Sequence, residues 1–382
     1  MRSALGVYLH WPYCGRICPY CDFNVYRHRG NEDQGLALKA ALIRDLEFQA
    51  AGLGDRDLVS VFFGGGTPSL MAPEWISDIL EACARLWPTA SDLEVTMEAN
   101  PTDAEAAKFE AFRAAGVNRL SLGLQSLKDD ALKALGRNHS AREGRDAARL
   151  AAGIFPRLSI DLIYARPDQT VAAWKDELSE ALELGAQHVS PYQLTIETGT
   201  AFERAVNRGR LAPPGQDLAA DLYDVTQQVL TDAGFEAYEV SNHAHSPEHQ
   251  SRHNRLYWQG EDYLGVGPGA HGRITRQGQR QATVGEMNPR AFVEKAKVSG
   301  HGLAEMQDLS PIDAAEERLL SGLRILEGVA FEEVSAIGLY PDHTEVRTLI
   351  ADGLLVDDKA RLRATLAGRL VLNWLTSRLA LA

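Results

Sequence analysis

The sequence predicts an α/β protein: a partial (β/α)6 barrel of the TIM type, followed by a mainly helical, winged-helix-like C-terminal domain. Two observations lead to this prediction. Six short runs rich in β-branched and aromatic residues alternate with longer segments of helical periodicity, which is typical of parallel βαβ units. Runs such as VSVFF and LSIDLIY are almost continuously apolar, as buried parallel strands are. Because a closed barrel of this type has eight units, we expect an open one.

Each predicted strand is followed by a predicted helix. We expect strands at 6–10, 58–63, 93–98, 119–124, 158–164 and 188–195. We expect helices at 33–51, 74–86, 103–115, 127–135, 171–184 and 217–233, where apolar residues recur at helical spacing. Polar residues stand at or near the carboxyl ends of these strands, which is where barrels of this class carry their chemistry.

The chain is predicted to have three parts. The barrel occupies 1–235, an extension with a short strand at 235–240 and a polar, His-rich loop at 241–251 occupies 236–304, and a helical domain occupies 305–382. In the extension, the glycine-rich stretch 265–272 is expected to be irregular. In the last part we expect helices at 312–326, 332–337, 345–352 and 367–379, with a two-stranded wing at 354–356 and 361–364. From 305 onward there are 13 acidic and 8 basic residues, which favours a packing or lid role over DNA binding.

Composition excludes several classes of protein. The 382 residues carry a formal charge of −13, which argues against nucleic acid as a partner. No apolar run has the length of a membrane span, and the first residues lack an apolar secretory core. We therefore expect a cytoplasmic protein. Of the four cysteines, Cys83 lies on an apolar helical stripe with Ile79 and Trp87 and is expected to be a core residue.

The other cysteines form a site candidate. Cys14, Cys18 and Cys21 have CxxxCxxC spacing, unlike the dispersed cysteines of a disulfide scaffold. Three thiolates can hold three irons of a [4Fe–4S] cluster and leave the fourth iron open to an external molecule. The alternatives are unrelated buried thiols or a zinc site, for which His10 or Asp22 would be the fourth ligand.

This spacing is similar to that of the radical S-adenosylmethionine superfamily, whose open iron chelates the methionine end of adenosylmethionine. Tyr20, just before the third cysteine, fits the resemblance. The stretch FFGGGTP, which includes Gly65, Gly66 and Thr67, resembles the glycine loop of that superfamily, which contacts the methionine amino group. Glycines at such a place let the backbone approach a ligand without a Cβ clash.

Within the superfamily, the whole chain resembles the oxygen-independent coproporphyrinogen III dehydrogenase group, and most of all the HemW group of heme chaperones. The matching pieces are VYLHWPYCGRICPYCDF, VFFGGGTPSL, EVTMEANP, GVNRLSLGLQSL, ALGRNHS, SIDLIYARPDQT, SPYQLTIE, YEVSNHA, HNRLYW and GVGPGAHG. The third position of the usual GGE loop is glycine here, and GGGTP is typical of this group.

The resemblance implies roles for individual residues. Tyr8 is expected to face adenosylmethionine beside the cluster, and Glu98 to accept a hydrogen bond from its amine or ribose. Gln125, Arg137 and Asp161 match positions that line the cofactor cavity. Glu98 capping a helix and Arg137 as a surface charge are the alternatives. Asp161, between apolar residues of a buried strand, needs a partner or a function.

Three departures distinguish the chain from the dehydrogenase or from both groups. Phe23 stands where the dehydrogenase has a further cysteine, and the first predicted strand begins within about ten residues of Met1, without the dehydrogenase's N-terminal extension. Both speak against coproporphyrinogen decarboxylation. In DLIYARPDQT, Ala165-Arg166 replaces the usual glycine and leucine, a change that has no physical explanation from the sequence alone.

The hexapeptide HNRLYW, which begins at His253, matches the HNxxYW signature that the HemW group links with heme binding. A neutral imidazole can ligate heme iron, and the two aromatic rings that end the motif offer flat apolar faces. The alternatives are a strand start with the aromatic residues in the core and His253 hydrogen-bonded, or a zinc site from the spaced histidines His243, His245, His249 and His253. His271 is a lesser candidate for the heme site.

The resemblance therefore implies a heme-binding protein with a [4Fe–4S] cluster and adenosylmethionine. It would deliver heme to acceptor proteins, such as membrane-bound respiratory enzymes, through protein contacts. The second hypothesis is a radical enzyme of porphyrin biosynthesis that acts on coproporphyrinogen III. A zinc-binding structural protein is the third.

Overall fold

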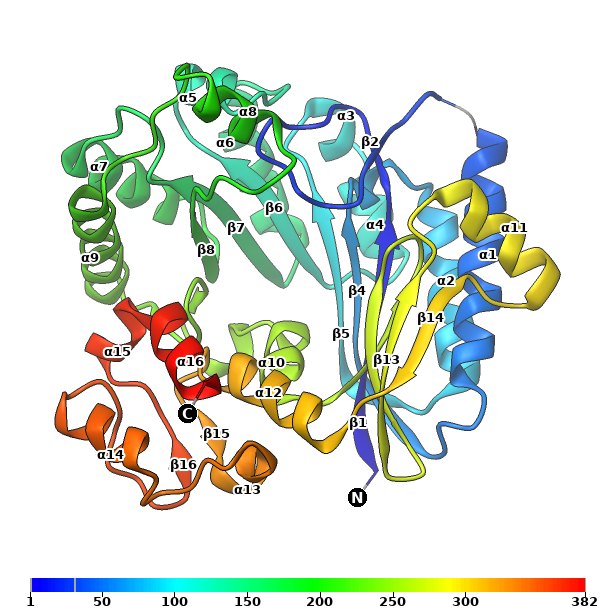
Figure 1. Ribbon diagram of the computed structural model, residues 1–382. Helices are drawn as coiled ribbons and strands as arrows, with labels where there is room; N and C mark the ends of the chain where they lie inside the picture. The colour runs from blue at the N-terminus through cyan, green and yellow to red at the C-terminus, as the bar shows by residue number, and fades with distance from the viewer. Residues whose placement is uncertain (1, 31, 382) are drawn as a thin grey trace.

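The computed structural model describes residues 2–30 and 32–381. Within them, one twelve-stranded sheet has a central run of six parallel strands. These are β1 (Ser3–Trp11), β4 (Arg56–Gly65), β5 (Thr89–Ala99), β6 (Arg119–Gln125), β7 (Arg157–Tyr164) and β8 (His188–Gln193). They match the six predicted strands and curve into an open barrel (Figure 1). The predicted fold class is confirmed.

The extension continues the sheet at both edges. β11 (Asp262–Val266) pairs in parallel with β1, and β12 (His271–Arg276), β13 (Gln279–Gly285) and β14 (Leu303–Asp308) follow in antiparallel order. At the other edge lie β10 (His243–Ala244) and β9 (Glu236–Ala237). Of the stretch 265–272, which was expected to be irregular, residues 267–270 form a turn, and the rest belongs to β11 and β12. Only two residues of the strand expected at 235–240 are in a strand. The glycines serve close packing of backbones: a Cβ on Gly265 would lie 2.1 Å from the His271 carbonyl oxygen.

Helices cover the outer face of the barrel (Figure 1). Four follow the prediction: α1 (Glu32–Ala50), α2 (Pro73–Leu86), α7 (Val171–Leu182) and α9 (Gln216–Asp232). The helix expected at 103–115 is divided into α3 (Asp103–Ala106) and α4 (Phe109–Ala114), and α5 (Asp129–Ala134) is shorter than expected. Helix α6 (Ala141–Ile154) was not predicted. Its buried residues are alanines and Gly144, so the large apolar side chains that reveal a helical period are missing. Also present are α8 (Ala201–Asn207), α10 (Arg252–Gln259) and α11 (Pro289–Ser299).

The C-terminal helices lie below the barrel, at the end opposite the cysteine loop (Figure 1). They are α12 (Pro311–Gly322), α13 (Phe331–Val334), α14 (Thr344–Ala351), α15 (Leu366–Leu370) and α16 (Leu372–Ala380), around a hydrophobic cluster of their own. The wing is formed by a bridge between Leu355 and Ala364, and β16 (Arg361–Leu362) pairs with β15 (Val329–Ala330). The three-part division at 235 and 304 stays a prediction. None of the described helices is both long and apolar enough to cross a membrane.

Candidate functional site

A cavity of about 720 Å³ lies inside the barrel. Every residue predicted for the site lines it: Tyr8, Cys14, Cys18, Tyr20, Cys21, Gly65, Gly66, Thr67, Glu98, Gln125, Arg137, Asp161 and His253. The structure thus brings together residues that are far apart in the sequence. Their individual roles stay predictions.

The cysteine loop closes the cavity at the carboxyl ends of the strands. Cys14 ends β2 (Tyr13–Cys14), which pairs with β3 (Tyr26–Arg27), and Cys18 and Cys21 lie on the turn between them. Burial raises the pKa of the Cys14 thiol to about 11 and also raises the pKa of the Cys21 thiol. Without iron the two thiols are therefore protonated, and binding of iron must release protons.

The structure shows how the two proposed fourth ligands of a zinc site are placed. Both ring nitrogens of His10 are engaged, Nδ1 with the Tyr8 hydroxyl at 3.1 Å and Nε2 with the Asn24 carbonyl oxygen at 2.9 Å. The other proposed fourth ligand, Asp22, is exposed. Across residues 2–30 and 32–381, no three His, Cys, Asp or Glu side chains are placed to hold one metal ion. The zinc alternative thus lacks a ready ligand set.

The glycine loop is bound to the cysteine loop through its backbone. The Gly66 N–H donates to the Trp11 carbonyl oxygen at 2.7 Å, and the Thr67 N–H donates to that of Tyr13 at 2.9 Å. A Cβ on Gly66 would lie 2.8 Å from both of these oxygens, so no other residue fits. Gly65 has a φ of 106°, which other residues rarely adopt. The glycines are therefore required by close packing of the loop against His10, Trp11 and Tyr13, and this packing places the loop beside Cys14.

Two carboxyl groups face the cavity from neighbouring parts of the barrel. Glu98 accepts the Gly65 N–H at 3.0 Å, so it is not a helix cap. Burial, and secondarily the nearby Asp161, raise the pKa of Glu98 to about 8. The pKa of Asp161 is also raised by burial, although the Ser121 hydroxyl donates to its carboxylate at 2.7 Å. A ligand with positive charge, such as an amine or a sulfonium, would be favoured at this wall.

Arg137 is part of the cavity wall, so its interpretation as a surface charge is wrong. Its Nη1 donates to the Cys18 sulfur at 3.5 Å, and its Nη2 donates to Asn100 Oδ1 at 2.6 Å and to the Gly123 carbonyl oxygen at 2.9 Å. A fixed guanidinium beside a cysteine sulfur suits a thiolate, and equally a negatively charged cluster bound through it.

The HNRLYW segment forms helix α10 and not the start of a strand, but the other part of that alternative, a buried and hydrogen-bonded His253, agrees with the structure. The His253 ring is 1% exposed and lies between two partners: Nδ1 is 2.9 Å from Ser60 Oγ, and Nε2 is 2.7 Å from the Tyr257 hydroxyl. The ring also stacks on Phe62 at 5.0 Å between centroids. Burial lowers the pKa of His253 to about 3. The imidazole is therefore neutral, and both of its nitrogens are occupied.

The remaining histidines of the extension do not join His253. His243 contacts Gln227 at 3.1 Å, His249 contacts Ser246 at 2.7 Å, and the His245 ring is exposed. None of the three lines the cavity, and neither does His271 on β12. The histidine zinc site and the role of His271 gain no support from this geometry.

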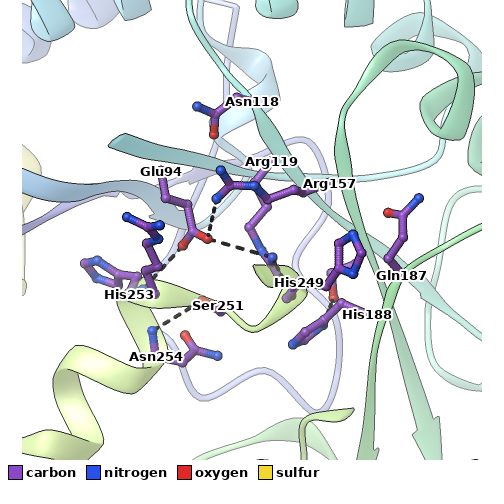
Figure 2. A network of polar contacts seen from close by, with 12 residues as sticks. Glu94, Asn118, Arg119, Arg157, Gln187, His188, His249, Ser251, His253 and Asn254 are labelled. Carbon is purple, nitrogen blue, oxygen red and sulfur yellow. Dashed lines mark hydrogen bonds and ion pairs between the residues drawn. The ribbon is translucent and has the colours of Figure 1, made fainter. Parts of the chain in front are cut away.

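A buried ionic cluster that was not predicted holds α10 in place (Figure 2). Glu94 is fully buried; its Oε2 lies 3.3 Å from Arg157 Nη1 and 3.8 Å from Arg119 Nη1, and its Oε1 accepts the His253 N–H at 3.3 Å. Arg119 also donates to the His249 carbonyl oxygen at 2.9 Å. Charged residues within predicted buried strands were the available signal, because they need partners there.

A second unpredicted network links Asp161 in the cavity wall to α10. The Ser159 hydroxyl contacts Asp161 Oδ1 at 3.1 Å and His188 Nδ1 at 2.7 Å, and His188 Nε2 lies 2.8 Å from the Tyr238 hydroxyl. That hydroxyl accepts the N–H of Ser251, the residue that caps α10, at 3.3 Å. A continuous chain of polar contacts thus joins Asp161, on one wall of the cavity, to the first residue before α10.

Comparison with known proteins identifies the family. The Radical SAM superfamily model matches residues 8–181, and the HemN C-terminal domain model matches residues 309–371. The heme chaperone HemW of Escherichia coli is 36% identical, over 97% of this chain and 96% of that protein. The chain belongs to the HemW family. HemW of Bacillus subtilis is 34% identical, over 98% of this chain and 97% of that protein.

Other relatives and structures agree with membership of the HemW family. The mitochondrial radical S-adenosyl methionine domain-containing protein 1 of Bos taurus is 42% identical, over 97% of this chain and 86% of that protein. Among solved structures, the radical SAM enzyme coproporphyrinogen III oxidase (HemN) of Escherichia coli superposes with a TM-score of 0.82, at 21% identity, over 99% of this chain and 90% of that chain. This likeness supports the fold.

Proposed function

We propose that this HemW-family protein is a heme chaperone, which binds heme and delivers it to acceptor proteins. It would carry a [4Fe–4S] cluster on Cys14, Cys18 and Cys21, with adenosylmethionine at the open iron. The observation that carries the proposal is that the HNxxYW helix and the three cysteines face one cavity. The near full-length likeness to proteins named heme chaperone HemW supports it.

The cofactor half of the cavity has the chemistry that adenosylmethionine needs. The backbone of Gly65 and Gly66 would lie against its methionine part, and Glu98, with one oxygen on the Gly65 N–H, has its other oxygen for an amine. Arg137 fixes Cys18 from the side. When bound and reduced, the cluster supplies an electron for the reductive cleavage of adenosylmethionine.

The other half of the cavity would receive the heme. Phe62, Tyr257 and Trp258 line it and provide aromatic faces. His253 can ligate iron only after it gives up one of its hydrogen bonds, to Ser60 or to Tyr257. The Tyr257 hydroxyl, which bonds to Nε2, belongs to the same helix and lines the cavity. We therefore assign Nε2 as the iron ligand and the Tyr257 hydroxyl as the partner that is released when heme binds.

A hemin titration tests this assignment. We expect His253→Ala to weaken hemin binding by at least tenfold, as followed by the heme absorbance, because a metal–ligand bond is lost. His245→Ala is the matched control, since that ring is exposed in the same loop, and it should bind hemin like the unaltered protein. Equal binding by both variants, each with an unchanged melting temperature, would remove His253 from the heme site.

Anaerobic reconstitution tests the cluster. We expect about four irons and four labile sulfides per chain. Stoichiometric zinc without sulfide would instead support the third hypothesis.

The second candidate function is that of an oxygen-independent coproporphyrinogen III dehydrogenase, favoured by the similarity in fold to HemN. Phe23, 61% exposed at the cavity mouth in place of a cysteine, speaks against it. Incubation with coproporphyrinogen III, adenosylmethionine and reductant under anaerobic conditions separates the two functions. Appearance of protoporphyrinogen would overturn the chaperone proposal. Respiratory acceptors and a cytoplasmic location belong to the same proposal.

A further inference from the structure

The C-terminal helices reach the cavity through one side chain. Among the described residues that line the cavity, Arg324 is the one that comes from beyond α10. It follows α12 directly, after the capping residue Leu323. Arg324 thus comes from the C-terminal helices but lines a cavity of the barrel, where it could contact a ligand.

The Arg324 guanidinium is held in place by Trp258 but makes few hydrogen bonds. It lies over the Trp258 ring at 4.6 Å from the centroid, and its Nη2 makes one long contact with Glu239 Oε2, at 3.4 Å. Its Nε has no partner. Glu239 is fully buried and has shorter bonds elsewhere, because its Oε1 accepts the Ser241 N–H at 2.7 Å and Asn242 Nδ2 at 2.6 Å. The guanidinium therefore retains donors for another acceptor.

The local charge also favours an anion. A second guanidinium, that of Arg369, is 7% exposed and donates to the Glu239 backbone carbonyl oxygen at 2.7 Å, while its Nη1 has no partner. Two guanidinium groups thus lie beside Glu239, that of Arg324 at its carboxylate and that of Arg369 at its backbone carbonyl oxygen. A guanidinium placed over an indole ring can still donate its N–H groups to a carboxylate.

We propose that Arg324 is the receptor for a carboxylate of the ligand that occupies the α10 half of the cavity. On the proposed function, on which this inference rests, that group is a propionate of heme. The aromatic faces of Tyr257 and Trp258 would receive the apolar ring, and Arg324 at its edge would fix the orientation by charge. A purely structural role, in which Arg324 only joins α12 to α10, is the competing explanation.

A comparison of two ligands separates these explanations. Hemin and its dimethyl ester, which lacks both carboxylates, are titrated against the intact protein, Arg324→Gln and Arg318→Gln. Arg318 is the matched control, since it also joins α12 to α10, through the Trp258 carbonyl oxygen at 3.0 Å, but does not line the cavity. We expect Arg324→Gln to weaken hemin binding about tenfold, as loss of a charged hydrogen bond does, and to change ester binding less than twofold.

The control Arg318→Gln keeps Arg324 and should therefore show the same preference for hemin over the ester as the intact protein. An equal loss of hemin and ester in Arg324→Gln would show a structural role and overturn the inference, as would equal affinity of the intact protein for the two ligands. Failure of the intact protein to bind hemin at all would instead contradict the proposed function, and the inference with it.

Discussion

At the scale of single residues, the structure shows how Ala165 and Arg166 are accommodated in the loop after β7. Ala165 is buried and has a φ of 56°, in the left-handed region that a glycine adopts without strain. Arg166 is buried and pairs through both terminal nitrogens with Glu177 of α7. Its charge is thus neutralised away from the cavity, which neither residue lines.

Replacing Ala165 by glycine should stabilise the protein. The left-handed conformation costs alanine about 1 kcal/mol or more, while glycine adds somewhat less than 1 kcal/mol of entropy to the unfolded chain. We expect a small net gain in the free energy of unfolding, measured by urea denaturation, with hemin binding unchanged. The same substitution at Ala173, in the first turn of α7, should destabilise by about 1 kcal/mol. A loss of stability at both positions would contradict the strain at Ala165.

Site residues that belong to short sequence motifs could be predicted from the sequence. Residues whose role depends on contacts between distant segments could not. The cysteines, the glycine loop and His253 are recognisable from spacing within a few residues. Glu94 and Arg119 belong to different strands, and their meeting depends on the register in which Thr96 pairs with Arg119. The engaged state of His253 likewise depends on Ser60, which is 193 positions away.

At the scale of elements, α10 depends on its neighbours for its position. It has eight residues, and a helix that short is unstable in isolation. Its first turn is bound by Glu94 and by the cap Ser251, and its last turn by Arg318 of α12. The part of the cavity lined by α10 therefore depends on these contacts for its shape.

Glu94→Gln should loosen α10. The substitution leaves Arg119 and Arg157 without their carboxylate, and removing one partner of a buried pair costs about 3 kcal/mol or more. We expect this loss in the free energy of unfolding, together with faster hydrogen exchange at the α10 amides. Glu47→Gln is the matched control, because its pair with Arg85 is at the surface and contributes less than about 1 kcal/mol. Unchanged exchange in Glu94→Gln would mean that other contacts hold the helix.

At the scale of the whole molecule, the six parallel strands were predictable because the pattern of each βα unit is local. In each unit a short apolar run, the strand, is followed by a segment with apolar residues at helical spacing. The strands β11 to β14 were not, because glycine and polar residues interrupt their apolar pattern. They take their place from pairing: β11 pairs with β1, and β12, β13 and β14 each pair with the strand before them. Helix α6 was missed because small residues form its buried face. Patterns that depend on contacts between distant segments are invisible in a single sequence.

Acid should destabilise the protein through its buried histidines. Burial lowers the pKa of His139, aided by Arg137, and that of His243, aided by Arg369, to about 4 each, from an ordinary value of 6.5. Between pH 6.5 and pH 4 the unfolded chain binds more protons than the folded protein does. The free energy of unfolding therefore falls as the pH falls through this range, with a slope approaching about 1.4 kcal/mol per pH unit for each histidine. Urea denaturation at pH 7, 5.5 and 4.5 should show a shallower dependence for the double variant His139→Gln, His243→Gln, whatever its absolute stability. His245→Gln, with its exposed ring, should keep the original slope. An unchanged slope in the double variant would mean that these two histidines are protonated in the folded state.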